Sequence, residues 1–273
     1  MDDFGGKVAV VTGAGSGIGR ALALRCAREG MRVVAADVKE ERLTSLRSQL
    51  EELGADVLAA AVDVSSAAAV GQFAADCERT FGVPDLLFNN AGILRLGETW
   101  SHEPGDWQTM LSINVLGVVH GLNAFVPRML AAGKPAHIVN TGSVGSLVAA
   151  PGMAQYTAAK MAVRGITECL QYDLAAQEAP IGVSLLCPGP VLTSISDDLM
   201  GIESGAPDGD PADHLMAGQP DFITADEVAE RTFAGIRSGD FWIFTHPFGR
   251  YLEGKSRAIV DGAVPVYSEV TFD

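Results

Sequence analysis

The sequence predicts an α/β fold, in which one doubly wound parallel sheet of about seven strands carries helices on both faces. Short apolar runs alternate with helix-length segments along most of the 273 residues. These runs are continuously apolar, which is typical of strands buried on both faces of a parallel sheet. A glycine-rich turn follows the first run. This combination indicates a Rossmann-type sheet.

The alternation predicts each element in chain order. The expected strands are Val8–Val11, Arg32–Ala36, Val57–Val62, Leu86–Phe88, His137–Asn140, Val183–Leu186 and Phe241–Phe244. The expected helices are Arg20–Glu29, Glu40–Leu53, Ala67–Phe81, Trp107–Leu130, Ala154–Ala176 and Asp226–Ser238. No Ser/Pro-rich linker interrupts the series, so we expect residues 1–273 to form a single domain.

The charge balance argues against several classes of partner. Nineteen Lys and Arg residues against 34 Asp and Glu residues give a formal net charge of −15. No run of Lys or Arg could follow a phosphate backbone, so nucleic acid is not expected as a partner. We find no apolar stretch near the ~18 residues that span a bilayer, and no signal peptide. The sequence therefore predicts a cytoplasmic protein with no membrane partner.

The cysteines and histidines indicate neither a metal site nor a disulfide framework. Cys26, Cys77, Cys169 and Cys187 are far apart and lack CxxC spacing, so we expect small core residues in a reducing compartment. The five histidines have no metal-ligand spacing. No metal is expected.

Two segments depart from the regular alternation. Residues 194–222 contain too many glycines and prolines for a long helix, and they follow the strand end where ligands bind in this architecture. We expect a substrate lid there, with a disordered segment as the alternative. Residues 248–273 form an extension beyond the last expected strand.

A glycine-rich turn, Thr12 to Gly19, lies between the first strand and the first helix. Glycines there permit a tight turn and let backbone N–H groups approach a pyrophosphate at the helix N-terminus. Asp37 follows the second strand, 18 positions after Gly19, where a carboxylate can bind a ribose 2′-hydroxyl and repel a 2′-phosphate. Neither Ser16 nor Val38 supplies a compensating cation, so NAD is favoured over NADP.

Three side chains suggest proton-transfer chemistry at the same end of the sheet. Tyr156 and Lys160 lie four positions apart in an expected helix and so share a face. Ser143 lies just beyond the strand His137–Asn140. A tyrosine with a pKa of about 10 is a poor base, but a nearby ammonium and a positive nicotinamide ring favour the phenolate. Asn114 lies within a helical segment, where asparagine is unfavourable.

These residues resemble the motifs of the short-chain dehydrogenase/reductase family, in the branch with chains of roughly 250 residues. The resemblance covers about residues 5–195 and rests on the turn Thr12 to Gly19, Asp63, Asn89-Asn90-Ala91-Gly92, Asn114, Ser143, Tyr156-x-x-x-Lys160, Pro188-Gly189 and Thr193. It implies an NAD-dependent alcohol dehydrogenase, which fits the expected dinucleotide-binding turn.

The resemblance also implies roles for individual residues. Tyr156 is the acid/base, Ser143 orients the substrate oxygen, and Lys160 binds the nicotinamide ribose. Asn114 supports a water-linked proton path. Asp63 lies near the adenine, Asn90 near the adenosine ribose, and Thr193 near the carboxamide. The full set expected to contact the cofactor is Gly13, Ser16, Gly17, Ile18, Gly19, Asp37, Asp63, Val64, Asn90, Ala91, Gly92, Tyr156, Lys160, Pro188, Gly189, Val191 and Thr193.

The expected substrate is a neutral, hydrophobic secondary alcohol or its ketone, since apolar side chains surround the expected pocket. These side chains are Leu94, Leu96, Val144, Leu147, Met153, Met200, Ile202, Leu215, Met216 and Phe222, with Arg95 as the one cation. The ending Ile243-Phe244-Thr245-His246-Pro247 resembles bacterial members that act on bulky aromatic alcohols, including Cα-dehydrogenases. The longer C-terminus makes a homodimer as plausible as a homotetramer.

Two other functions compete with this one. The first is an NADPH-dependent ketoreductase of acyl or polyketide type, which Asp37 and the lack of a nearby cation disfavour. The second is a sensor that binds NAD without chemistry. Retention of Ser143, Tyr156 and Lys160 disfavours a sensor, because a sensor needs no proton acceptor.

Overall fold

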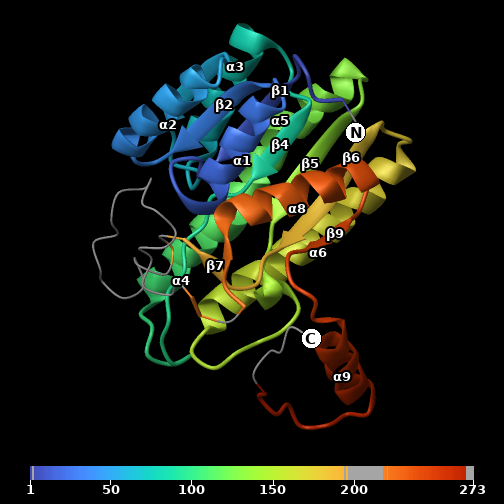
Figure 1. Ribbon diagram of the computed structural model, residues 1–273. Helices are drawn as coiled ribbons and strands as arrows, with labels where there is room; N and C mark the ends of the chain where they lie inside the picture. The colour runs from blue at the N-terminus through green and yellow to red at the C-terminus, as the bar shows by residue number, and fades with distance from the viewer. Residues whose placement is uncertain (2, 194, 196–217, 220, 269–273) are drawn as a thin grey trace.

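The computed structural model describes residues 1, 3–193, 195, 218–219 and 221–268. Its centre is a seven-stranded parallel sheet in the order β3-β2-β1-β4-β5-β6-β9 (Figure 1). The strands are β1 (Val8–Thr12), β2 (Arg32–Asp37), β3 (Val57–Ala61), β4 (Leu86–Asn89), β5 (Ala136–Thr141), β6 (Ile181–Cys187) and β9 (Trp242–Phe244). The predicted fold class is confirmed, and each strand lies within a few residues of its expected position.

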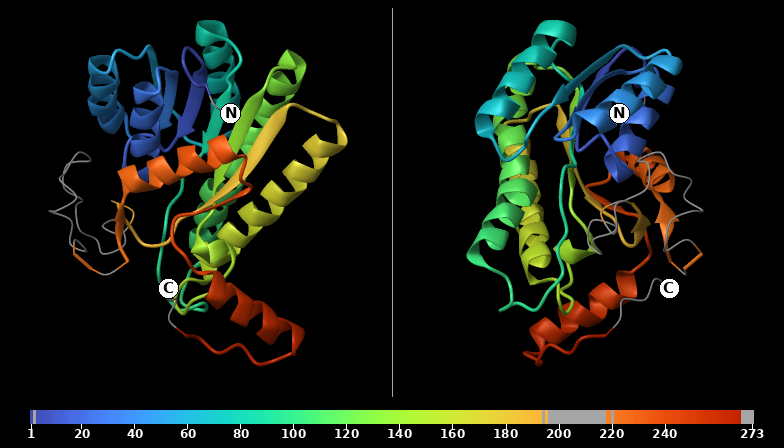
Figure 2. Two further views of the ribbon diagram at one scale, coloured as in Figure 1. Left: turned by 45° about the vertical axis from the view of Figure 1, so that its right-hand side comes forward. Right: turned by 90° about the vertical axis from the view of Figure 1, so that its left-hand side faces the viewer.

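Helices cover both faces of the sheet (Figure 2). One face carries α1 (Gly17–Arg28), α2 (Glu40–Glu52) and α8 (Ala225–Ser238); the other carries α3 (Ala67–Phe81), α5 (Gly117–Ala132) and α6 (Ala154–Ala176). The inner strands β1, β2, β4, β5 and β6 are buried from both sides, so their side chains divide between two cores. Leu22 and Phe88 belong to one core, and Val10 and Phe125 belong to the other.

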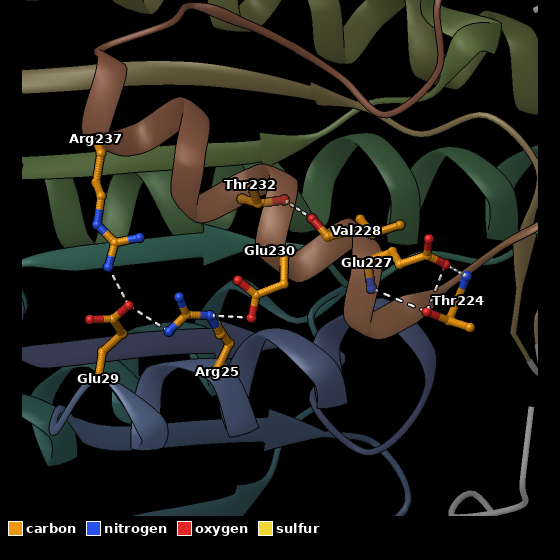
Figure 3. A network of polar contacts seen from close by, with 8 residues as sticks. All are labelled: Arg25, Glu29, Thr224, Glu227, Val228, Glu230, Thr232 and Arg237. Carbon is orange, nitrogen blue, oxygen red and sulfur yellow. Dashed lines mark hydrogen bonds and ion pairs between the residues drawn. The ribbon is translucent and has the colours of Figure 1, made fainter.

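A polar network joins α8 to α1 (Figure 3). Glu29 pairs with both Arg25 and Arg237, and the Arg25 Nε lies 2.6 Å from the Glu230 carboxylate. The Arg25 guanidinium also lies 4.9 Å from the centre of the Phe233 ring. α8 is thereby fixed on α1, the helix that follows the glycine-rich turn.

The expected helix Trp107–Leu130 is three segments in the structure. α4 (Pro104–Leu111) leads into η1, a single π-helical turn (Ser112–Leu116), and then into α5. The continuous stretch Pro104–Ala132 is long and apolar enough to cross a membrane by length and composition, contrary to the expectation from sequence. In this stretch 44% of the apolar window is buried inside the protein, where Val118, Phe125 and Met129 pack into the cores.

A second, two-stranded sheet follows β6. β7 (Val191–Leu192) pairs in parallel with β8 (Ile223–Thr224). Thr245 and His246 support this pair: the Gly189 N–H donates to Thr245 Oγ1 at 3.0 Å, and His246 Nε2 lies 2.7 Å from the Asp221 carbonyl oxygen. The predicted lid over 194–222 lies almost wholly outside the described residues.

The C-terminal extension contains a helix that the sequence did not predict, α9 (Gly249–Val260). None of its residues is buried, and it stands apart from the sheet and its helical layers (Figures 1 and 2).

The cysteine expectation is wrong at one position. Cys26, Cys77 and Cys187 are buried thiols, whereas Cys169 is exposed on α6. The helical periodicity of α6 turns position 169 to solvent, so this residue is not part of the core.

Candidate active site

The three proton-transfer candidates meet at the carboxyl edge of the sheet. Ser143 follows β5 and begins η2, a short 3-10 turn (Val144–Ser146), while Tyr156 and Lys160 lie in the first turns of α6. The extended backbone of Ser143 ends the strand, and its hydroxyl accepts a hydrogen bond from the Gly145 N–H at 3.1 Å. The chain order β5, η2, α6 therefore brings Ser143 back to the start of α6.

Tyr156 and Ser143 interact directly through their side chains. Burial raises the pKa of Tyr156 above its ordinary value, and the hydrogen bond from Ser143 acts in the opposite direction. The pKa of Tyr156 is thus raised in the protein alone, whereas the expected lowering also involves the positive nicotinamide ring of a bound cofactor. A Cβ on Gly145 would lie 3.5 Å from the Tyr156 ring, an ordinary van der Waals contact.

Lys160 is a buried cation held by a neutral group. It is 4% exposed, and its ammonium donates to the Thr141 carbonyl oxygen at 2.8 Å. Burial lowers the pKa of Lys160 to about 8. The Lys160 Nζ lies 5.6 Å from the centre of the Tyr156 ring. The two residues predicted from their spacing are thus brought together on one face of α6.

Asn114 lies in the π-helical turn η1 and is fully buried. Its amide exchanges two hydrogen bonds of 2.8 Å with the backbone of Ile93. A Cβ on Gly92 would lie 3.2 Å from Asn114 Oδ1 and 3.6 Å from Lys160 Nζ, so Asn114 and Lys160 approach each other at this glycine. Single π-turns often occur at functional sites, and this one provides the reason for an asparagine in a helix.

The glycine-rich turn fits a closely approaching phosphate. Gly13 and Gly17 have positive φ angles, and a Cβ on Gly19 would lie 2.0 Å from the Gly13 carbonyl oxygen. Ser16 caps α1 without a side-chain hydrogen bond, so its side chain leaves the N–H groups of the first turn to other acceptors. Ile18, in that first turn, packs against the core. The turn can therefore accept a pyrophosphate at the helix N-terminus.

Asp37 reaches this turn from the end of β2. Its carboxylate accepts from the Gly15 N–H and the Lys39 N–H, both at 2.9 Å. Arg42, from the first turn of α2, donates to Ser16 Oγ at 3.2 Å. The expectation that no cation lies nearby is wrong, because the helical turn after β2 folds Arg42 back over the glycine turn. Periodicity alone gives no sign of that contact.

The residues expected around the adenosine lie in two different environments, one directly after β3 and one within the sheet edge. Asp63 is exposed, and its carboxylate accepts from Ser65, while Val64 is buried beside Gly117. Asn90 is held within the sheet edge instead: its amide donates to the Thr12 carbonyl oxygen at 3.1 Å. Asn90 therefore joins strand ends in addition to any role toward a ribose.

Two threonines that the sequence analysis did not single out organise this edge. Thr12 Oγ1 accepts from the backbone N–H groups of Asn90 and Ala91 at 2.9 and 3.1 Å. The Thr141 hydroxyl donates to Asn90 Oδ1 at 3.2 Å, and its carbonyl holds Lys160. The sequence feature that could have indicated their role is their position as the last residues of β1 and β5.

The segment after β6 lies against the glycine turn. Val144 N–H donates to the Pro188 carbonyl oxygen at 2.9 Å, and the Gly189 backbone packs on His246. Val191 and Thr193 are each 8% exposed, and Thr193 would contact a Cβ built on Gly17 at 3.1 Å. Thr193 is thus placed over the start of α1, beside the turn that would carry the phosphates.

The predicted apolar lining is described only in part. Met200, Ile202, Leu215, Met216 and His214 lie outside the described residues. The loop after β4 reaches the start of α6, where Gly97 pairs with Met153. Arg95 forms an ion pair with Asp106. Among the described residues, no group of His, Cys, Asp or Glu could hold a metal ion.

Comparisons with known proteins agree with this geometry. The family model for short chain dehydrogenases matches residues 7–201. A "CLA biosynthesis dehydrogenase/reductase" of Lactiplantibacillus plantarum is 32% identical over 98% of each chain. A Cα-dehydrogenase of Sphingobium sp. is 29% identical over 98% of this chain and 90% of its own. A short-chain dehydrogenase/reductase of Burkholderia phymatum, solved with NAD, has a TM-score of 0.90 and 37% identity, covering 99% of this chain and all of its own.

The chain belongs to the short-chain dehydrogenase/reductase family of oxidoreductases. The similarity to the Cα-dehydrogenase extends through the C-terminal part of the chain, in agreement with the resemblance of its Ile-Phe-Thr-His-Pro ending. Solved structures of similar proteins contain NAD or an NADP derivative.

Proposed function

We propose that the chain is an NAD-dependent dehydrogenase that interconverts neutral, hydrophobic secondary alcohols and their ketones. The observation that carries the proposal is the contact of Tyr156 with Ser143, with Lys160 buried behind them, at the edge that also holds the glycine turn. NAD, when bound, accepts a hydride from the alcohol carbon.

The protein's own residues handle the proton and the substrate oxygen. Tyr156 takes the hydroxyl proton of the alcohol on its phenolate oxygen, and Ser143 donates a hydrogen bond to the developing alkoxide. The Lys160 ammonium stabilises that phenolate electrostatically and passes protons toward Asn114. In the reverse direction Tyr156 protonates the forming alkoxide, so the same groups reduce a ketone.

Asp37 is the basis for proposing NAD. Its carboxylate lies at the glycine turn, where it would bind a ribose hydroxyl and repel a 2′-phosphate. Arg42 favours the second candidate, an NADPH-dependent ketoreductase, because a guanidinium at Ser16 could pair with that phosphate. Parallel assays of secondary alcohols with NAD and NADP distinguish the two; a clear preference for NADP would overturn the choice of NAD.

A hydrophobic substrate class follows from the apolar side chains that line the mouth of the site. Leu94, Val144, Leu147 and Met153 are partly exposed there, and Arg95 is engaged by Asp106. The assay panel should therefore include aryl, alicyclic, steroid and short aliphatic secondary alcohols. Turnover confined to acidic or phosphorylated substrates would contradict this assignment. We also propose a cytoplasmic homodimer or homotetramer, with residues 1–273 as one catalytic domain.

Tyr156→Phe tests whether chemistry occurs at this site. Removing the phenol should lower kcat by about 10²- to 10⁴-fold and leave the NADH dissociation constant within a factor of about two. Tyr172→Phe is the matched control, because Tyr172 lies on the same helix and is 67% exposed. Unchanged turnover in Tyr156→Phe would show that another group is the acid/base, whereas NAD binding without turnover of any substrate in the wild type would favour the non-catalytic sensor.

A further inference from the structure

The C-terminal arm, residues 249–267, exposes more apolar surface than a solvated helix needs. Ile259 is 71% exposed and Val260 84%, while Val264 and Val266 are each 81% exposed. α9 makes up most of this arm and buries none of its residues. Exposed aliphatic side chains gathered on one short segment are typical of an interaction surface.

The length of α9 also calls for a partner surface. Helices shorter than about 12–15 residues are marginal in water unless a face is packed, and α9 has 12 residues with glycine at Gly254. Tyr251, Leu252, Lys255 and Ala258 are partly buried against the same chain, but none of the residues of α9 is fully buried. The end of the helix, Ile259 and Val260, is exposed within the described chain.

The charge of the arm restricts the class of partner. α9 carries three basic side chains, Arg250, Lys255 and Arg257, against one acidic side chain, Glu253, and the rest of the arm adds the acidic Asp261. The whole chain has a net charge of −15. A second copy of this chain is thus an acidic partner for a basic helix.

One surface of the chain matches the arm in both polarity and charge. The loop patch, defined as Leu96, Glu98, Trp100 and Glu103, joins β4 to α4. Trp100 is 81% exposed and Leu96 is 55% exposed, and both glutamates are exposed. A large exposed tryptophan between acidic side chains fits a basic, aliphatic helix, and tryptophan is enriched among residues that dominate binding energy.

We propose that the arm of one copy packs on the loop patch of a second copy, and that the second copy returns the same contact. Two reciprocal contacts of this kind form a closed two-fold interface. Trp100 and Leu96 would cover Ile259 and Val260 at the end of α9, while Glu98 and Glu103 pair with its cations. The loop patch is connected through Gly97 to Met153 at the start of α6, so this interface borders the candidate active site.

Charge reversal on both surfaces tests the proposal. Lys255→Glu/Arg257→Glu in the arm, or Glu98→Lys/Glu103→Lys in the loop patch, should each raise the dissociation constant of the assembly at least about tenfold. The four changes combined in one chain should restore most of that affinity. Mass by light scattering over a range of protein concentrations measures each variant, and the unfolding temperature checks that each is folded.

Trp100→Ser should weaken the same assembly by at least about tenfold without changing the unfolding temperature, because the side chain is largely in solvent within one copy. Arg79→Glu is the control reversal, since Arg79 is an exposed cation on α3. A monomeric wild type, an assembly that none of the variants weakens, or a combined variant that stays as weak as its parents would overturn the proposal.

Discussion

Lys160 and Lys134 lie at opposite edges of one sheet, and each donates to a backbone carbonyl oxygen. Lys134, at the amino edge, also forms a 2.7 Å ion pair with Asp85, whose other oxygen accepts from the Val8 N–H. Lys160, at the carboxyl edge, has no carboxylate partner within the described residues and is more deeply buried. Lys134, through its ion pair with Asp85, holds strand ends together. Lys160 has no such pair in the described residues, so its charge can act on a ligand bound beside it.

The largest contrast should come from replacing each lysine by methionine. Lys160→Met should lower kcat/KM by at least about 100-fold, because it removes the charge that favours the Tyr156 phenolate. Lys134→Met should leave kcat/KM within about twofold and destabilise the fold by about 1–2 kcal/mol through loss of the Asp85 pair. Steady-state kinetics and urea unfolding check both; equal loss of activity in the two variants would remove the functional distinction.

Two glycines within helices allow the effect of crowding at the carboxyl edge to be measured apart from the effect of helix propensity. Gly19→Ala should prevent measurable NADH binding and destabilise the protein by more than about 2 kcal/mol, because a Cβ there would strike the Gly13 carbonyl. Gly165→Ala, on exposed α6 surface with no atom within 4 Å of its Cβ, should stabilise by about 0.5–1 kcal/mol. Calorimetric titration with NADH and thermal unfolding measure the pair. An alanine tolerated at position 19 would refute the close packing described for the turn.

The lowered pKa of Lys160 predicts a pH dependence of stability. In the folded protein burial lowers the pKa of this amine from its ordinary 10.5 to about 8, so folding disfavours the charged form. The unfolded chain binds more protons between these values, and the free energy of unfolding should rise from about pH 8 to 10.5. The rise attributable to Lys160 is about 3 kcal/mol. Urea unfolding of Lys160→Met across this pH range should show no such rise in the free energy of unfolding. A pH profile identical to that of the wild type would contradict the burial argument.

The smallest expected effect concerns the other cation at this edge. Arg42→Gln should weaken NADPH binding about three- to tenfold and change NADH binding less than twofold, because the guanidinium at Ser16 is placed to meet a 2′-phosphate. Parallel fluorescence titrations measure both constants. Arg47→Gln, on the same helix, is the control; an equal loss for NADPH and NADH in Arg42→Gln would assign Arg42 to a structural role.

The sequence predicted those features of the fold and site that depend on a repeating apolar pattern or on a fixed spacing between residues. Continuous apolar runs located the seven strands, and the register of Tyr156 with Lys160 placed both on one face of α6. The π-turn around Asn114 was missed because a one-residue expansion leaves the apolar pattern of a helix intact. Arg42 was missed because its contact with Ser16 depends on how α2 folds back. The burial of Tyr156, which raises its pKa in the protein alone, was missed because burial, unlike charge, is not evident from local sequence.

The short β7–β8 pair fixes both ends of the chain interval between its two strands. Since Val191 and Ile223 are hydrogen-bonded neighbours whose position is secured by Thr245 and His246, the chain between them begins and ends at one fixed point. Doubling the length of such a closed segment costs only about 0.6 kcal/mol. A change in the length of this interval should therefore cost little and leave the sheet intact.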